Sequence, residues 1–115
     1  MSVTIYHNPR CSKSRQTLGL LQEKGIEPEI IEYLDTPPSA NKLKEILKML
    51  GKEPQELMRK GEAIYKELGL KDSTMTKAEL IKTMVENPKL IERPIVINGD
   101  KAALGRPPEN VLDIL

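Results

Sequence analysis

Two β-rich segments flank one helical segment at the start of the chain, and this order strongly limits the fold. Residues 3–6 form a short apolar run that predicts a buried strand, and residues 29–34 predict a second strand. Between them, residues 17–21 predict a helix with one apolar side, and Gly25 is suited to end it. Two strands joined through a helix form a β-α-β unit, so we expect them to be parallel with a right-handed crossover.

The middle of the chain, residues 39–91, is expected to be mostly helical. Ser39 is suited to N-cap an amphipathic helix, because its hydroxyl can accept a hydrogen bond from the first helical turn. Shorter helices are predicted at residues 54–59 and 64–68. The pattern over residues 76–79 is typical of a capping box that opens a further helix.

The end of the chain returns to β structure. Residues 94–97 predict a strand, residues 98–100 (Asn-Gly-Asp) a hairpin turn, and residues 101–104 the antiparallel return strand. A last helix is predicted from Glu109 to Leu115, with Pro107 or Pro108 at its first position. Three of its apolar side chains are expected to face inward: Val111, Leu112 and Leu115.

The complete order is therefore β-α-β, a helical block, and β-β-α. A mixed four-stranded sheet with helices on its faces accommodates this order. We predict an α/β fold of the thioredoxin-like kind, with a helical insert at about residues 39–91 between strands two and three. Because 115 residues suit one compact domain, residues 1–115 are expected to form a single one.

Composition excludes several classes of function. The net charge of +1 argues against general nucleic-acid binding, which needs a strong basic excess. Met1–Thr4 run straight into the first strand, so we expect no signal peptide, and no apolar stretch reaches the roughly 18 residues that cross a bilayer. With one cysteine there is no internal disulfide, and we expect a cytoplasmic protein without membrane partners. Prolines and short exposed strands favour a monomer.

Cys11 lies at the predicted junction of a strand and a helix. The unpaired N–H groups and partial positive charge of a helix start favour thiolate over thiol, and Arg10, Lys13 and Arg15 add cationic charge nearby. Such surroundings lower a cysteine pKa from about 8.5 to between roughly 3.5 and 7.5. The alternative is an inert buried cysteine, but these neighbours are polar and favour a reactive one.

Three arginines lie at loop or helix-end positions: Arg59, Arg93 and Arg106. Two of them precede prolines, which stiffen the backbone and fix the direction of the neighbouring side chain. Guanidinium groups bind tetrahedral oxyanions through paired hydrogen bonds. The predicted topology can bring the Cys11 turn, the start of the strand at Pro94 and the loop after Leu104 to one end of the sheet. The alternative is that these are ordinary solvated arginines.

Two further side chains can tune the sulfur. His7 titrates near neutrality and can orient the thiolate through a hydrogen-bond chain, or it can simply bond the turn backbone. Ser14 is one helical turn after Cys11, and its hydroxyl can donate to the thiolate or satisfy local backbone groups.

Other chemistries lack their residues. One histidine and one cysteine give no zinc site, and there is no phosphate-binding Gly-rich loop that ends in Lys-Ser or Lys-Thr. The sequence after Cys11 is Ser-Lys-Ser, so the dithiol Cys-x-x-Cys is absent. Any disulfide formed on Cys11 must be resolved by an external thiol.

Four segments together resemble the glutaredoxin-coupled arsenate reductase (ArsC) family, in its short YfgD-type branch: residues 7–15, 57–60, 92–97 and 105–108. The resemblance extends over essentially the whole chain. It implies a thioredoxin-like fold with a helical insert and a cis peptide bond before Pro94.

The same resemblance implies the roles of individual residues. Cys11 would be the nucleophile on arsenate, and Arg59, Arg93 and Arg106 would hold the oxyanion, with His7 helping to lower the pKa of the thiol. No bound cofactor is implied. Glutathione would be the thiol cosubstrate and glutaredoxin the protein partner.

Two other functions stay open at this point. The run Cys11–Ser14 resembles the active site of a monothiol oxidoreductase that acts on glutathione mixed disulfides. The Spx-type transcription regulators share the fold and bind transcription machinery without being enzymes, although many of them carry the Cys-x-x-Cys that is absent here.

Overall fold

The computed structural model of the protein describes residues 3–115, so part of the Met1–Thr4 stretch used for the signal-peptide prediction lies outside the described residues. The chain divides into two compact units, one of Met1–Thr36 with Arg93–Leu115 and one of Pro37–Glu92. The predicted helical insert falls within the second unit, and the single domain over residues 1–115 stays a prediction. Over residues 3–115, no helix has the length and apolar character needed to span a bilayer.

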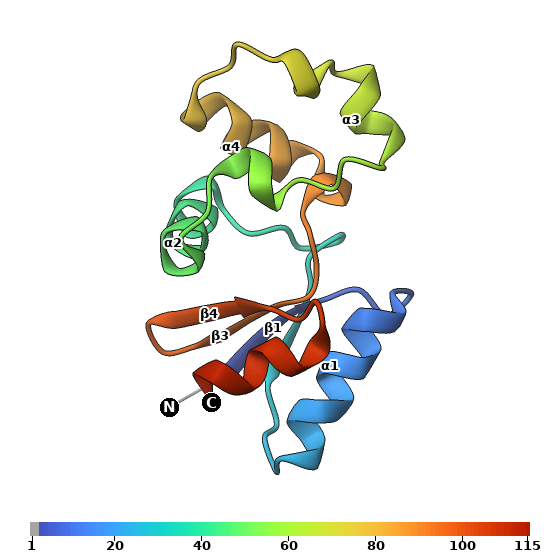
Figure 1. The fold of residues 1–115 in the computed structure, drawn as a ribbon, viewed down its shortest axis with the longest axis vertical. Coiled ribbons are helices and arrows are strands. Elements are labelled where there is room, and N and C mark those ends of the chain that lie inside the picture. The colour runs from blue at the N-terminus through green and yellow to red at the C-terminus, as the bar shows by residue number, and fades with distance from the viewer. Residues whose placement is uncertain (1–2) are drawn as a thin grey trace. The chain divides into compact units, whose positions relative to one another are not determined.

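The first unit is built on a four-stranded sheet with the order β2-β1-β3-β4 (Figure 1). Its strands are β1 (Val3–His7), β2 (Glu29–Glu32), β3 (Ile95–Asn98) and β4 (Lys101–Leu104). β1 and β2 are parallel, as expected for a β-α-β unit, whereas β3 is antiparallel to both β1 and β4. The mixed sheet and the thioredoxin-like fold class are confirmed.

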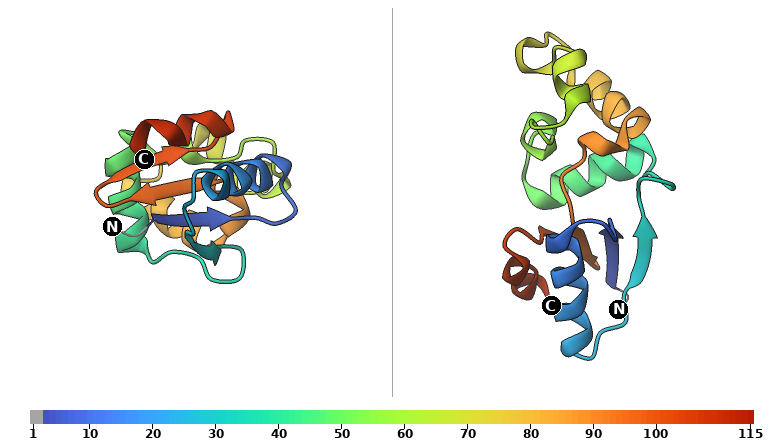
Figure 2. Two further views of the ribbon diagram at one scale, coloured as in Figure 1. Left: turned by 90° about the horizontal axis from the view of Figure 1, so that it is seen from below. Right: turned by 90° about the vertical axis from the view of Figure 1, so that its right-hand side faces the viewer.

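One face of this sheet forms a core with α1 (Ser12–Glu23) and the 3₁₀ helix η4 (Pro108–Ile114) (Figure 2). The buried residues of this core come from β1, β3, α1 and η4: Val3, Ile5, Leu21, Val96 and Val111. Burial of such aliphatic side chains contributes about 1.5–3 kcal/mol each. The core therefore packs α1 against the sheet, and Cys11 lies just before the first residue of this helix.

The structure corrects the predicted end of the second strand. β2 stops at Glu32, whose carbonyl accepts the N–H groups of Asp35 and Thr36 in a turn. Ile30 lies within β2 as predicted, whereas Leu34 lies beyond its end, and the two side chains are 47% and 37% exposed. β2 is the edge of the sheet, so it lacks a neighbouring strand on its outer side.

The last helix also differs from the prediction. It is a 3₁₀ helix, with Pro108 at its start as expected. The inward orientation predicted for Leu112 and Leu115 was wrong, since they are 37% and 42% exposed, whereas Val111 is fully buried. A 3₁₀ helix has about three residues per turn, so Val111 and Ile114 share one side and the leucines turn outward.

The second unit is helical, as predicted for the insert. Its elements are α2 (Ala40–Leu50), η1 (Pro54–Leu57), α3 (Ala63–Glu67), η2 (Leu70–Asp72), α4 (Lys77–Glu86) and η3 (Pro88–Leu90). Both predicted caps are confirmed: Ser39 Oγ accepts from the N–H of Lys42 at 3.1 Å, and Thr76 and Glu79 form a reciprocal capping box. α2 packs against α4 within this unit.

Candidate active site

Cys11 is the N-cap residue of α1, at the junction that the sequence predicted. Its N–H donates to the carbonyl of Asn8 at 3.0 Å, and the side-chain Oδ1 of Asn8 accepts from the N–H of Arg10 at 3.0 Å. These two bonds close the turn between β1 and α1. The turn therefore fixes the sulfur at the positive end of the helix, where Cys11 is 9% exposed.

The surroundings of the sulfur favour the thiolate. Burial raises the pKa of the Cys11 thiol, but hydrogen bonds from the backbone N–H groups of Ser14 and Lys13 lower it. The Arg93 guanidinium lowers it further, through a side-chain hydrogen bond and through its charge, and the net pKa lies below the ordinary value. Arg93 is the cation that lowers this pKa. The side chains of Arg10, Lys13 and Arg15, which were expected to contribute, are not among the causes of the shift.

Arg106 brings a second guanidinium to the sulfur. Its Nη2 lies 3.7 Å from Cys11 Sγ, and its Nε donates to the backbone carbonyl of Arg93 at 2.8 Å. The peptide bonds Arg93–Pro94 and Arg106–Pro107 are both cis, and the first of these confirms the expectation from the family resemblance. Two of the three arginines expected to bind an oxyanion thus lie beside the thiol.

A close contact between the Arg106 loop and α1 was not predicted from the sequence. A Cβ placed on Gly105 would meet the side chain of Thr17 and would lie 2.7 Å from Cγ of Pro94. The backbone of Gly105 also donates to the Pro94 carbonyl at 2.9 Å. Only a residue without a side chain lets the loop approach α1 this closely. Gly105 is therefore a positioning residue for Arg106.

His7 and Ser14 form a buried pair behind the turn. The Ser14 hydroxyl lies 2.6 Å from Nδ1 of His7 and accepts the N–H of Asn8 at 3.0 Å. Burial lowers the pKa of His7 and the charge of Arg15 lowers it further, whereas Glu32 raises it, with a net lowering that favours the neutral ring.

The Ser14 hydroxyl does not contact the sulfur, which was one of the two arrangements expected from the sequence. The hydroxyl of Ser14 is engaged with His7 and Asn8, whereas the contact of Ser14 with the sulfur is made by its backbone N–H. The hydroxyl thus secures the turn that carries Cys11. The thiolate-tuning roles of His7 and Ser14 remain predictions.

Arg59 lies in the second unit. Its Nη1 is 3.9 Å from a carboxylate oxygen of Glu62 and its Nε is 3.8 Å from one of Glu92. The backbone N–H of Arg59 donates to the Leu90 carbonyl at 2.7 Å, next to an isolated antiparallel β-bridge between Met58 and Ile91. The backbone of this arginine is therefore fixed within the insert, and its role in oxyanion binding stays a prediction.

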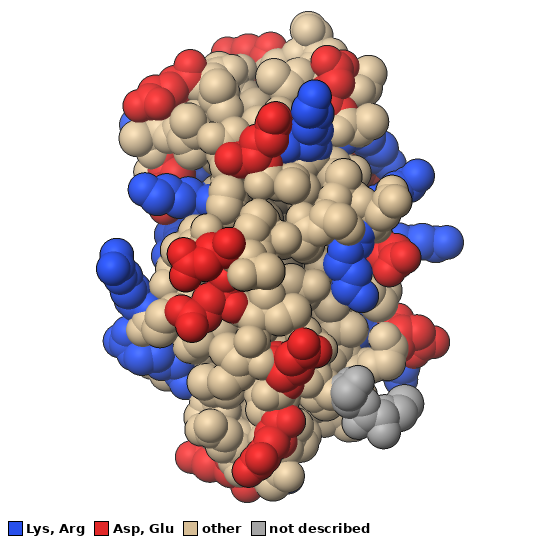
Figure 3. Space-filling view, turned by 180° about the vertical axis from the view of Figure 1, so that it is seen from behind, with Lys and Arg blue, Asp and Glu red and all other residues tan. Residues whose placement is uncertain are grey.

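Side chains of both signs occur on the face shown in Figure 3. Within residues 3–115, no three His, Cys, Asp or Glu side chains lie close enough to hold a metal ion. The reactive groups described in the first unit are thus one thiol with a lowered pKa and the two guanidinium groups beside it.

The fold and the site together define a thioredoxin-like protein with a single cysteine at a helix start, beside two arginines. The chain belongs to the ArsC family, whose family model matches residues 6–114.

The sequence similarity between this chain and its relatives extends along the whole chain. An arsenate reductase of Haemophilus influenzae is 55% identical over 116 residues, which cover 100% of both chains. The uncharacterized protein YfgD of Escherichia coli is 58% identical over 114 residues, covering 98% of this chain and 96% of that protein. The solved structure of an arsenate reductase from Vibrio cholerae superposes with a TM-score of 0.96 at 54% identity, covering 100% of this chain and 98% of that one.

Proposed function

We propose that the protein reduces arsenate to arsenite, with Cys11 as the nucleophile. The observation that carries the proposal is the placement of Arg106 Nη2 at 3.7 Å from Cys11 Sγ, in a chain about half identical to proteins named arsenate reductase. A thiolate alone suits many reactions. A thiolate flanked by guanidinium groups suits an anionic substrate that must approach an anionic sulfur.

In the first step, the Cys11 thiolate attacks arsenic and forms a sulfur–arsenic bond. With the arsenate monoanion as substrate, one arsenic-bound hydroxyl takes up a proton from solvent and leaves as water, so the adduct carries one negative charge. Arg93 and Arg106 offset the charge of the oxyanion and of the adduct, and such preorganised donors usually contribute most to catalysis of this type. Arg59, in the second unit, is proposed as a third guanidinium ligand on the resemblance to the family.

In the second step, the thiol of glutathione attacks the Cys11 sulfur. The electron pair of the sulfur–arsenic bond stays on arsenic, which is reduced from the pentavalent to the trivalent state and leaves as arsenite with the thiol proton. Cys11 then carries glutathione in a mixed disulfide. Since the chain has no second cysteine, glutaredoxin restores the thiol by exchange, which fits a cytoplasmic protein in a reducing environment.

The test is a coupled assay with arsenate, glutathione, glutaredoxin, glutathione reductase and NADPH. We expect NADPH consumption that needs all components and is lost in Cys11→Ser. Lys13→Ser, which replaces a neighbouring exposed side chain, is the matched control and should retain turnover. Turnover in Cys11→Ser equal to that of the parent protein would refute the proposed nucleophile, and no arsenate-dependent turnover in the parent would refute the reaction.

A further inference from the structure

The main-chain carbonyl of Arg106 is bonded by a side chain that the proposed reaction does not use. Asn110 lies in η4, four residues after Arg106, and its amide Nδ2 donates to this carbonyl at 2.9 Å. The backbone N–H of Asn110 donates to the carbonyl of Pro107 at 3.0 Å. Asn110 therefore holds two consecutive carbonyl groups of the loop that carries Arg106.

Asn110 stands on a part of η4 that the core fixes. The next residue, Val111, is fully buried and packs with residues of β1, β3 and α1. Pro108, at the start of η4, is also buried. The side chain of Asn110 is itself exposed, so its bond to Arg106 is not required to satisfy a buried polar group. The bond instead ties the Arg106 loop to a helix that the core holds in place.

The guanidinium of Arg106 is held at the other end of the residue. Its Nε donates to the Arg93 carbonyl at 2.8 Å, and its Nη2 lies 3.7 Å from Cys11 Sγ. A long arginine side chain loses rotamer freedom whenever it is ordered on a ligand. When its main chain is already fixed, only the side-chain torsions remain to be ordered, so the guanidinium is preorganised for an anion.

We propose that Asn110 is a positioning residue for Arg106. Its amide fixes the main chain of the loop, so that the guanidinium of Arg106 points to the sulfur of Cys11 and to the oxyanion that approaches it. The inference rests on the proposed function only in the identity of that oxyanion, arsenate. Loss of the bond should weaken oxyanion binding beside Cys11, and it should do so through Arg106.

Protection of Cys11 by sulfate against iodoacetamide measures this effect. Asn110→Ala and Asn110→Leu, the second of which keeps the size of the side chain, should each raise the sulfate concentration for half-protection. The expected increase is about threefold to tenfold, the range for loss of one hydrogen bond. In an Arg106→Gln background the same substitutions should change it by less than about twofold, because the residue that they act through is absent. An equal effect in both backgrounds would overturn the proposal.

Asn98→Ala is the matched control. Asn98 also donates its amide to a carbonyl of η4, that of Ile114, at 2.7 Å. It pairs with Val3 at the start of β1, whereas Cys11 follows the end of this strand. The variant loses the same kind of bond at a distance from the Arg106 loop, so it should lower the urea midpoint of unfolding and leave sulfate protection within about twofold. Equal loss of protection in Asn98→Ala would show that general loosening of η4 is sufficient, and would overturn the proposal.

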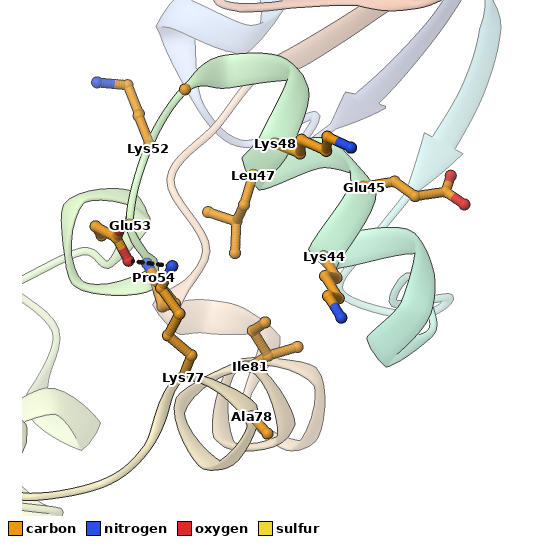
Figure 4. Close-up of a pocket in the computed structure, with 11 residues that line it drawn as sticks. Lys44, Glu45, Leu47, Lys48, Lys52, Glu53, Pro54, Lys77, Ala78 and Ile81 are labelled. Carbon is orange, nitrogen blue, oxygen red and sulfur yellow. Dashed lines mark ion pairs between the residues drawn. The ribbon is translucent and has the colours of Figure 1, made fainter.

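A second control lies in the other unit. Lys77 Nζ is 3.0 Å from Glu53 Oε2, and Lys77→Met removes this surface ion pair (Figure 4). The half-protecting sulfate concentration should stay within about twofold of that of the parent protein. A shift as large as that in Asn110→Ala would attribute the effect to the loss of any surface interaction and would also overturn the proposal.

A measurement without anions separates this inference from the proposed reaction. In isotopically labelled protein, the Nε–H signal of Arg106 is identified in the nitrogen–proton spectrum by its absence in Arg106→Gln. Because this N–H donates to the Arg93 carbonyl, its exchange with water should be slow in the parent protein and at least about threefold faster in Asn110→Ala. Asn98→Ala should leave the exchange rate unchanged.

The two measurements have distinct outcomes. Unchanged exchange of the Arg106 Nε–H in Asn110→Ala would overturn the inference, whatever the arsenate turnover. Faster exchange in this variant, together with no protection by sulfate in the parent protein, would refute the anion site of the proposed function and still support the positioning role of Asn110.

Discussion

Nη2 of Arg106 lies 3.7 Å from Sγ of Cys11, although 95 positions separate the two residues in the sequence. The contact joins the start of α1 to the loop after β4, and it depends on the antiparallel pairing of β3 with β1 and β4. Arg106 is held at a second point, since its Nε donates to the carbonyl of Arg93. The sheet thus delivers both guanidinium groups to one sulfur.

Ionisation of Cys11 is the first property to test. Because backbone N–H groups and Arg93 outweigh the effect of burial on the pKa of Cys11, its alkylation by iodoacetamide should show a midpoint below the ordinary cysteine pKa of about 8.5. Arg93→Met removes a hydrogen bond and a positive charge, so the midpoint should rise. The pH dependence of the alkylation rate measures both values.

Arg10→Met is the matched control for this measurement. Arg10 is exposed and adjacent to Cys11 in sequence, yet it is not among the groups that shift the pKa of the sulfur. Its removal should leave the alkylation midpoint unchanged. An equal rise in both variants would show that general positive charge, and not the Arg93 contact, sets the ionisation of Cys11.

Oxyanion binding beside the sulfur gives a second prediction. Sulfate or arsenate should slow the alkylation of Cys11 by occupying the space between the sulfur and the guanidinium groups. Arg106→Gln should raise the anion concentration needed for protection by about tenfold or more, since hydrogen bonds to charged groups contribute roughly 1.5–3 kcal/mol. Alkylation rates at increasing sulfate concentration measure this change.

The same variant separates arsenate reduction from glutathione-disulfide exchange. Exchange with a glutathionylated peptide needs the thiolate but no inorganic anion, so Arg106→Gln should lose arsenate turnover and largely retain exchange. Loss of both activities in equal proportion would instead favour a monothiol oxidoreductase in which Arg106 serves the thiolate.

His7 gives a prediction about stability and pH. Burial lowers the pKa of His7 in the folded protein, so the unfolded chain binds more protons near and below the ordinary histidine pKa of about 6.5. The contribution of His7 to the free energy of unfolding is therefore fully present above that pH and is lost as the pH falls toward the folded-state value. Urea unfolding between pH about 5 and 8 should show this loss.

His7→Asn removes the titrating group while it keeps a polar side chain opposite Ser14. Since His7 is the only histidine of the chain, the variant should show a much flatter dependence of the unfolding free energy between pH about 5.5 and 7. An unchanged pH dependence in the variant would mean that the buried His7–Ser14 pair does not control stability in this range.

The parts of the structure that depend on local sequence could be predicted. Cys11 at a helix start follows from a short strand, a turn and an amphipathic segment, and the caps at Ser39 and Thr76 follow from hydroxyl groups that accept from N–H groups three residues later. The sheet topology also followed, because a β-α-β unit and an Asn-Gly hairpin allow few arrangements.

Features that depend on contacts between distant segments were not predictable. The exposure of Ile30 depends on β2 being an edge strand, and the outward orientation of Leu112 depends on the choice of a 3₁₀ over an α-helix. Sequence spacing placed Arg93 and Arg106 only as candidates, because their approach to Cys11 depends on the strand pairing of a complete sheet. Lys13 was expected to act through its ammonium group, whereas its backbone N–H makes the contact.

Gly105 provides the last prediction. Gly105→Ala would place a methyl group against the Thr17 side chain and 2.7 Å from Cγ of Pro94, so the loop that carries Arg106 must move away from α1. Overpacking of this kind costs about 1–3 kcal/mol, and the displaced Arg106 should weaken the protection of Cys11 by sulfate. Urea unfolding and the alkylation assay measure the two effects on one protein.

Gly19→Ala is the matched control, because a Cβ at Gly19 meets nothing within 4 Å and the residue lies inside α1. This substitution should stabilise the protein by about 0.5–1 kcal/mol and leave sulfate protection unchanged. Adding Thr17→Ala to Gly105→Ala removes the hydroxyl and methyl groups that the new side chain meets, and it should restore part of the sulfate protection. Full protection in Gly105→Ala alone would show that the close packing of the loop on α1 does not position Arg106.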